Sequence, residues 1–255
     1  MLKLSLPINL FYAASILYTV GFLCFTLRLK NLSFYLLITA ALLNLSSDVI
    51  GRWIIWPFCN MFYEVFFLPL SISLIGISLF SLKKEQGLWL YPLVILFCIL
   101  AVFFSEGYYP PFTLMSKSIF AHIFHLFMFF AHSFLFSSFF ISLVSTFLQK
   151  EEEISNKLMI LGYGMLCIAG LFGMTWSYVG RADTISWNHY FFHSIAIWLY
   201  YSALLHLFLR KSLRLKEKTF FLFIGAGLIF CLDILPQIGG IHKPKILSTE
   251  LYEFF

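Results

Sequence analysis

Charge is what this sequence has least of: only 11% of its 255 residues are Asp, Glu, Lys or Arg. Soluble domains carry about 25% charged and roughly 45–50% apolar residues. Here 61% of the residues are hydrophobic, and 33 are phenylalanine. This composition excludes an ordinary water-soluble domain and leaves no material for a soluble enzyme on a membrane anchor. It predicts an integral membrane protein.

Cysteine is also scarce, and its five copies are scattered without a C-x-x-C or C-x-x-C-H motif. We therefore expect no thiol relay, no zinc site and no covalent haem attachment on this chain. The net charge of +5 comes mostly from short loops, which is typical of membrane orientation rather than of nucleic-acid binding. No small-residue cleavage site precedes Tyr12, so we expect a retained first helix rather than a signal peptide.

Most of the sequence consists of long apolar runs. A membrane-spanning helix needs about 20 mainly apolar residues, and polar breaks divide the chain into eight such runs. The sequence therefore predicts an all-α fold, a polytopic transmembrane helical bundle forming a single membrane domain over residues 1–255. Seven spans is the competing count, because the fourth run is short and begins with Trp89 and Pro92. The eight predicted spans are 8–27, 32–50, 62–82, 88–105, 118–147, 157–177, 189–209 and 219–238.

Lys and Arg are divided unevenly between the predicted loops. Loops one, three, five and seven carry eleven of these residues, and loops two, four and six carry only Arg52, Lys117 and Arg181. Short loops rich in Lys and Arg stay in the cytoplasm. We therefore expect both termini on the non-cytoplasmic side of a cell inner (plasma) membrane.

The seven histidines are the candidate functional residues, because an ionisable side chain within a bilayer is energetically costly. On the fifth predicted span, His122, His125 and His132 point within about 80° of one another. His132 lies about 15 Å below His122. Such a stripe suits a proton path, a metal site or a haem site. For any single histidine, a hydrogen bond to a neighbouring helix is the alternative.

The type of ligand can be weighed from the other polar residues. Neutral imidazole binds zinc, copper, nickel and iron. A cation transporter would normally also have more carboxylates than the three present here, which are Asp48, Glu64 and Asp233. Haem needs axial ligands, an apolar aromatic cradle and cations for its propionates. An aromatic fraction of 20% suits haem, although lipid-facing packing is the more common role of aromatic residues.

The segment from Gly173 to Asn188 carries a family resemblance. It begins Gly-Met-Thr-Trp176 and ends Trp187-Asn188. It resembles the tryptophan-rich external segment of the haem-handling proteins of cytochrome c assembly, the CcsA/HemX type of the WWD superfamily. That family's pattern is a Gly, a Trp, a spacer ending in Trp-Asp, and a helix ending in His. Here Trp176 precedes Asn188 by 12 positions, and His206 follows Asn188 by 18.

Three further pieces resemble this family in the same order along the chain. They are Trp56-Pro57…Asn60…Tyr63-Glu64, His122-Ile…Phe130-Ala131 and Gly239-Gly240-Ile241-His242. The chain departs from the family in its Trp-rich segment. The family's Trp-Asp-Pro-Lys-Glu run is replaced here by Trp187-Asn188-His189-Tyr190-Phe191.

The resemblance implies a set of haem contacts. His122 and His242 would be the outer axial ligands of a transiently held haem b, with His125 as the fallback for His122. The external segment 173–188 would form the haem platform with Trp176, Trp187 and Asn188, and Arg181 and Lys117 are candidates for propionate contacts.

The resemblance also implies that His206 is one ligand of a second site nearer the cytoplasm. We add His132, at a comparable expected depth, as a candidate partner of His206.

The leading hypothesis is a haem-delivery protein of c-type cytochrome biogenesis that presents haem at its outer face to apocytochrome c. The resemblance implies a second membrane subunit with a large external domain as partner. The protein would be a haem chaperone or synthase subunit rather than a stand-alone enzyme. Two alternatives are a HemX-like accessory or regulatory protein of haem synthesis, and a metal-ion or proton transporter lined by histidines.

Overall fold

The computed structural model describes residues 2–55, 64–83, 86–104, 118–148, 153–181, 189–209 and 214–235. These segments form eight α-helices, and no β-strand occurs among them. A 3₁₀ turn, η1 (Leu88–Leu90), precedes α4, and a π-helical turn, η3 (Phe230–Ile234), extends α8. The predicted all-α fold is confirmed for this part of the chain. The helices are α1 (Leu2–Thr26), α2 (Lys30–Ile55), α3 (Glu64–Lys83), α4 (Tyr91–Phe104), α5 (Ile119–Leu148), α6 (Glu153–Arg181), α7 (His189–Leu209) and α8 (Leu215–Ile229).

Membrane-spanning capacity is shown by length and composition for four of the described helices. The structure places a helix in each of the eight predicted spans, but the count of eight crossings and the side of the termini stay predictions. Three other helices are apolar and shorter. The four long segments are Leu6–Thr26, Lys30–Gly51, Ile119–Leu148 and Glu153–Gly180, and the shorter ones are Phe66–Leu82, Leu88–Phe103 and Phe192–Phe208.

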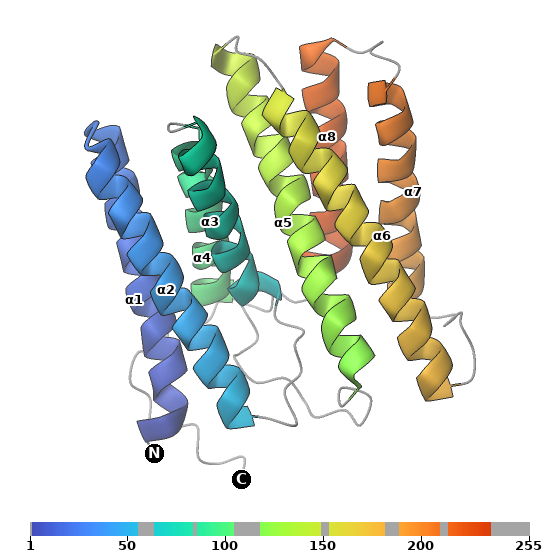
Figure 1. Ribbon diagram of the computed structural model, residues 1–255, viewed down its shortest axis with the longest axis horizontal. Coiled ribbons are helices and arrows are strands. Elements are labelled where there is room, and N and C mark those ends of the chain that lie inside the picture. The colour runs from blue at the N-terminus through green and yellow to red at the C-terminus, as the bar shows by residue number, and fades with distance from the viewer. Residues whose placement is uncertain are drawn as a thin grey trace.

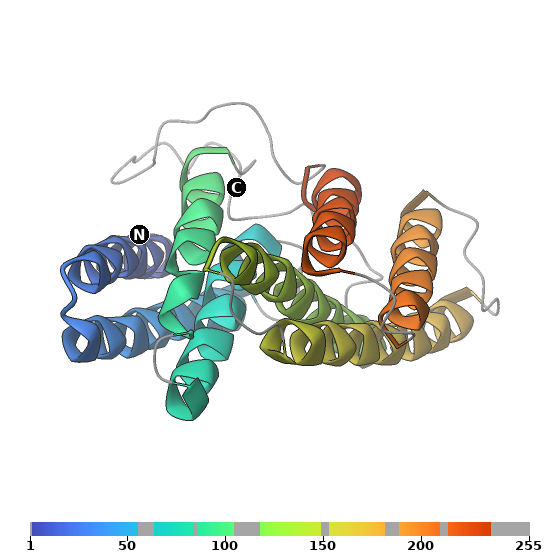
Figure 2. The ribbon, with the colours of Figure 1, turned by 90° about the horizontal axis from the view of Figure 1, so that it is seen from above.

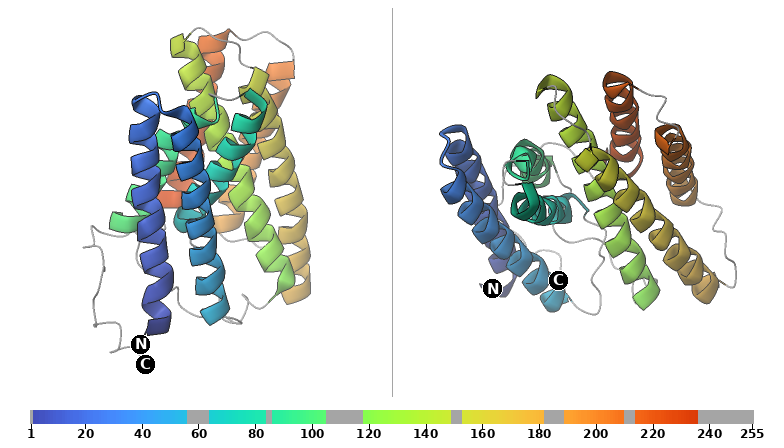
Figure 3. Two further views of the ribbon diagram at one scale, coloured as in Figure 1. Left: turned by 60° about the vertical axis from the view of Figure 1, so that its left-hand side comes forward. Right: turned by 45° about the horizontal axis from the view of Figure 1, so that its top comes forward.

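Successive helices run in opposite directions (Figure 1). The α1–α2 hairpin lies at one side of the molecule, and α7 and α8 lie at the other (Figure 2). The α3–α4 pair packs between that hairpin and α5 (Figure 3). α5 is the central helix, because it packs on α3, α6 and α8. A side chain on α5 can therefore meet partners from three other helices.

The first hairpin turn is built from helix-end chemistry. Arg28 has a φ of 65°, in the left-handed region that ends many helices. Its backbone N–H donates to the carbonyl of Phe25 at 3.0 Å, and the N–H of Leu29 donates to the carbonyl of Cys24 at 2.9 Å. These two bonds satisfy carbonyls at the end of α1. The Arg28 cation also lies at the negative end of the α1 dipole, where it is favoured.

The molecule is apolar both inside and outside. Leu135 and Ile197 are fully buried, whereas Leu27, Leu82 and Phe147 are 70%, 78% and 79% exposed. A helix that is hydrophobic all round suits a membrane span rather than a water-facing surface. The outer surface of these helices is therefore apolar, as expected of a surface that contacts lipid.

Serine hydroxyls join the helices where they approach most closely. Ser138 of α5 and Ser155 of α6 each donate to the other's backbone carbonyl at 2.8 Å. Ser142 of α5 and Thr219 of α8 have their hydroxyl oxygens 2.7 Å apart. Small hydroxyl residues allow close helix approach and hydrogen-bond across the interface, which is typical of helix packing in lipid. They fix α6 and α8 against α5.

Candidate functional site

Three predicted site residues, His122, His125 and His132, lie on α5. His125 and His132 are buried, and His122 is half-buried. His125 and His132 are seven residues apart, so they point within about 20° of one another. The same face of α5 meets two neighbours, with α6 beside His125 and α8 beside His132. α5 therefore carries imidazoles into separate contacts at two depths.

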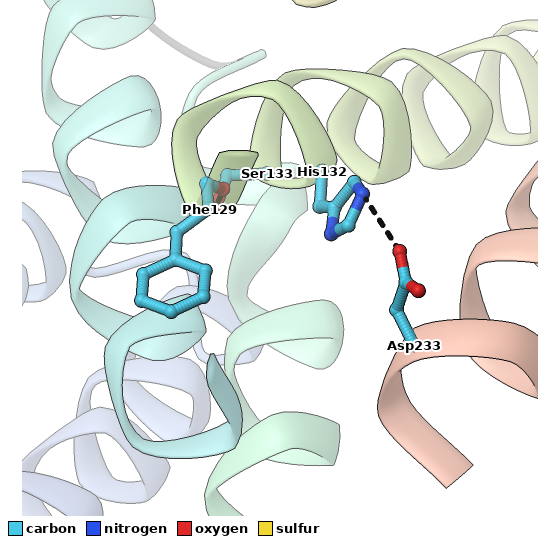
Figure 4. Close-up of polar contacts among 4 residues, drawn as sticks. All are labelled: Phe129, His132, Ser133 and Asp233. Atoms are coloured by element: carbon cyan, nitrogen blue, oxygen red, sulfur yellow. Dashed lines mark hydrogen bonds and ion pairs between the residues drawn. The ribbon is translucent and has the colours of Figure 1, made fainter. Parts of the chain in front are cut away.

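His132 forms a buried ion-pair contact with Asp233 of η3. The Nε2 atom of His132 lies 3.4 Å from Oδ2 of Asp233. The His132 side chain is 1% exposed and that of Asp233 is 16% exposed. Figure 4 shows the imidazole reaching from α5 to the carboxylate on the turn that ends α8. His132 lies near the middle of α5, 13 residues after its first residue, and Asp233 lies in the turn that ends the described part of α8.

The backbone beneath Asp233 is a π-helical turn. The backbone N–H of Leu235 donates to the carbonyl of Phe230, five residues earlier. A π-turn inserts an extra residue into the helix and so changes the direction in which the following side chains point. Such turns are rare and occur frequently at functional sites. Here the turn carries the only acid of the described part of α8 beyond its first turn.

Next to His132, another face of α5 is held against α3 by the side chain of Ser133. Ser133 donates to the carbonyl of Phe129 at 2.8 Å (Figure 4), and its hydroxyl also forms a short hydrogen bond with Ser71 of α3. α5 is thus held to α3 next to the residue that pairs with α8. The position of His132 relative to Asp233 is therefore set by contacts on both sides of the helix.

A buried imidazole–carboxylate pair can hold a proton. With one proton between them, the pair is neutral overall, either as imidazolium and carboxylate or as imidazole and carboxylic acid. Ionisable groups inside a bilayer are expensive unless they pair in this way. Gain or loss of one proton would leave a net charge in an apolar layer, so the pair couples its protonation to the surrounding packing.

His125 has a defined proton arrangement in its neutral form. Its Nδ1 lies 2.7 Å from the carbonyl oxygen of Ala121. A carbonyl can only accept, so Nδ1 carries the proton and Nε2 keeps its lone pair. Histidines that bind metals typically donate the other ring N–H to such a carbonyl. The His125 imidazole is therefore in the tautomer that can act as a ligand through Nε2.

Aromatic rings surround this imidazole. The ring of Trp176 of α6 lies edge-on to His125 at 5.8 Å between centroids, and Phe124 lies 6.1 Å from Trp176. Phe129 lies 6.0 Å from His125 on the next turn of α5. The Nε2 atom of the neighbouring His122 is shielded from solvent. This end of α5 and α6 combines imidazole nitrogen with flat aromatic surface.

The structure does not bring His132 and His206 together. His206 is exposed and lies in the last turn of α7. His132 instead faces α8. α7 packs on α6 and α8, so α8 and α6 stand between the two histidines.

Several predicted site residues lie outside the described residues. These are Lys117, Trp187, Asn188 and His242, and Arg181 is described only as the last residue of α6. The pairing of His122 with His242 therefore stays a prediction.

The sequence does not predict the His132–Asp233 contact itself. It marks both residues as ionisable groups in apolar runs, but the candidate partner that it suggests for His132 is His206. The available signal was that Asp233 is a lone acid deep in its run, and a buried acid must find a partner. Among the described residues, no three His, Cys, Asp or Glu side chains converge in a way that could hold a metal ion.

No protein-family model, no curated protein and no solved structure matches this chain. The class of protein is defined by its own geometry. It is an all-helical protein with four described helices long and apolar enough to cross a membrane, which is consistent with a membrane protein.

Proposed function

We propose that the chain is a multi-pass inner-membrane protein that holds haem b transiently for c-type cytochrome assembly. The observation that supports this most is the contact of His125 with Trp176 at 5.8 Å. It brings the helix that bears His122 against the helix that leads into the Trp-rich-like segment 173–188. These two parts of the family resemblance are about 50 residues apart in the chain, and the antiparallel α5–α6 hairpin places them side by side.

The residues at this end of the bundle fit haem in their chemistry. The Nδ1 proton of His125 is held by Ala121, which leaves Nε2 as the nitrogen that can donate to iron. Phe124, Phe129 and Trp176 supply apolar, aromatic surface around it. In this proposal His122 or His125, together with His242, would hold the haem iron. Haem supplies the vinyl groups to which the thiols of apocytochrome c add.

The residues of the chain act as a clamp and not as acid or base catalysts. The imidazoles would hold the iron, and the aromatic rings would exclude water from the porphyrin faces. Arg181 and Lys117 would balance the propionates. A second membrane subunit with a large external domain would recognise the apocytochrome.

The test is a visible spectrum of the full chain purified in detergent after expression with added haem. We expect a bis-histidine Soret band whose intensity falls severalfold in His122→Gln or in His125→Gln. Thr39→Ala is the matched control, because Thr39 is exposed on α2 and its hydroxyl donates to the Tyr35 carbonyl of its own helix. A colourless wild type, or equal haem content in all variants, would overturn the proposal.

A second candidate function is proton movement, and the buried His132–Asp233 pair favours it specifically. His122, His125 and His132 follow one stripe of α5 towards this pair, and Asp233 terminates the stripe. In vesicles, the chain would admit protons under an imposed potential, and Asp233→Asn would abolish this flux. Glu153→Gln is the control, because Glu153 is exposed in the first turn of α6 and lies off this stripe. Equal flux in vesicles without protein would exclude this function.

A further inference from the structure

A shallow groove follows the seam between α5 and α8, from the C-terminal part of α5 to the N-terminal part of α8. Its volume is about 360 Å³. Its walls are mainly aromatic and aliphatic, and a single charged side chain among the described lining residues lies at one end. The residues used below are Phe139, Leu143 and Thr146 of α5, and Lys216, Phe220 and Phe223 of α8.

The floor of the groove is closed to polar ligands. The rings of Phe139 and Phe223 lie 5.7 Å apart between centroids. The hydroxyls of Thr146 and Thr219 are 2.8 Å apart, and Thr219 is also bonded to Ser142. These hydroxyls are therefore engaged within the protein. Whatever lies along the groove must be apolar over most of its length.

The end of the groove at the start of α8 is positively charged. Lys216 and Arg214 are exposed in and before the first turn of this helix. The carboxylate of Glu217 accepts the backbone N–H of Arg214 at 2.8 Å, so this acid caps the helix. Lys218 lies over the ring of Phe208 of α7, 5.4 Å from its centroid, on the other side of α8. Lys216 is thus the cation that borders the groove.

The groove runs inward from this charged end. Lys216 and Phe223 are seven residues apart on α8, as are Thr146 and Phe139 on α5, which corresponds to a depth of about 10 Å. A cation at the outer end and an apolar channel below it match the two parts of one molecule. We infer that this groove binds an anionic phospholipid, with its phosphate at Lys216 and one acyl chain along Phe139, Phe220 and Phe223.

Charge and shape both select this occupant. Basic pockets between membrane helices recognise anionic headgroups, and a zwitterionic lipid would gain no net attraction from Lys216. Free phosphate would use the cation but leave the apolar channel empty. This inference does not depend on haem, because the groove lies at the opposite end of α5 from His122.

Native mass spectrometry of the full chain in detergent tests the headgroup. We expect phosphatidylglycerol to be retained in preference to phosphatidylcholine of the same acyl chains. In Lys216→Gln this preference should fall about fivefold, which corresponds to the attraction of one cation near an anionic lipid surface. Lys157→Gln is the matched control, because Lys157 is exposed in the first turns of α6 and its Nζ is 2.6 Å from Glu153.

The acyl-chain part is tested with the same instrument. Leu143→Trp fills the groove and should lower retention of both lipids, whereas Ile160→Trp, on the exposed side of α6, should leave it unchanged. Circular dichroism confirms that each variant is helical. The inference is overturned by equal retention of both lipids in the wild type, by an equal loss in Lys157→Gln, or by full displacement of phosphatidylglycerol with inorganic phosphate.

Discussion

His132 and Asp233 meet across the α5–α8 interface although 101 residues of sequence separate them. Their contact joins the central helix to the π-helical turn at the end of α8. Each residue alone would place an ionisable group in an apolar layer. Together they neutralise one another, so the pair ties the position of α8 to that of α5.

Removing one member of this pair should cost more than removing both. His132→Leu leaves a buried carboxylate, and Asp233→Leu leaves a buried imidazole. We expect His132→Leu to lower the free energy of unfolding by about 3–5 kcal/mol, and Asp233→Leu to lower it by less, because an unpaired imidazole can stay neutral. The double variant should be close to the wild type, because no unpaired group remains. Thermal unfolding in detergent measures this, and a double variant less stable than both single variants would contradict it.

The reciprocal hydrogen bonds of Ser138 and Ser155 should contribute measurably to the α5–α6 interface. Ser155→Ala removes the bond to the Ser138 carbonyl, and interhelical bonds of this kind are worth about 0.6–2 kcal/mol in membranes. A double-mutant cycle with Ser138→Ala isolates the coupling between the two hydroxyls. Thr175→Ala serves as the reference, since its bond stays within α6. Additive losses would show that the two serines act independently.

Gly87 should not tolerate any side chain. A Cβ at this position would lie 2.1 Å from the Gly76 carbonyl oxygen and 2.6 Å from the Phe80 backbone nitrogen. Backbone cannot move aside as a flexible side chain can, so Gly87→Ala should cost about 3 kcal/mol or more. Gly164→Ala is the control, because nothing lies within 4 Å of its added Cβ. Alanine there should leave stability unchanged or raise it by up to about 1 kcal/mol.

The predicted orientation can be tested at two exposed positions. Asn31 lies at the start of α2 and Gly180 near the end of α6, at opposite ends of the bundle (Figure 1). In a background without the native cysteines, Gly180→Cys should react with a membrane-impermeant maleimide on intact cells. Asn31→Cys should react only after permeabilisation, because its loop carries the positive charges that stay in the cytoplasm. The reverse pattern would invert the predicted topology.

The helical regions could be predicted because each apolar run is bounded by polar residues. Their ends could not. α8 begins at Leu215 and includes Lys216 and Lys218, although the apolar run predicts a span over 219–238. The first turn of a helix at the edge of an apolar layer can carry charge, because long basic side chains reach the polar region. Hydropathy alone therefore predicts a helix that is too short at its charged end.

The sequence by itself determined that the described chain is all helical and apolar, and that His122, His125 and His132 share α5. Helical periodicity gives the face on which a residue lies, but it does not give the helix that packs on that face. The short connection between α5 and α6 already places Trp176 near His125, whereas only the tertiary structure decided that Asp233 lies against His132. The physical reason is that α6 and α7 separate α8 from α5 in the chain, so the register of α8 against α5 is set by packing and by hydroxyl contacts such as Ser142–Thr219.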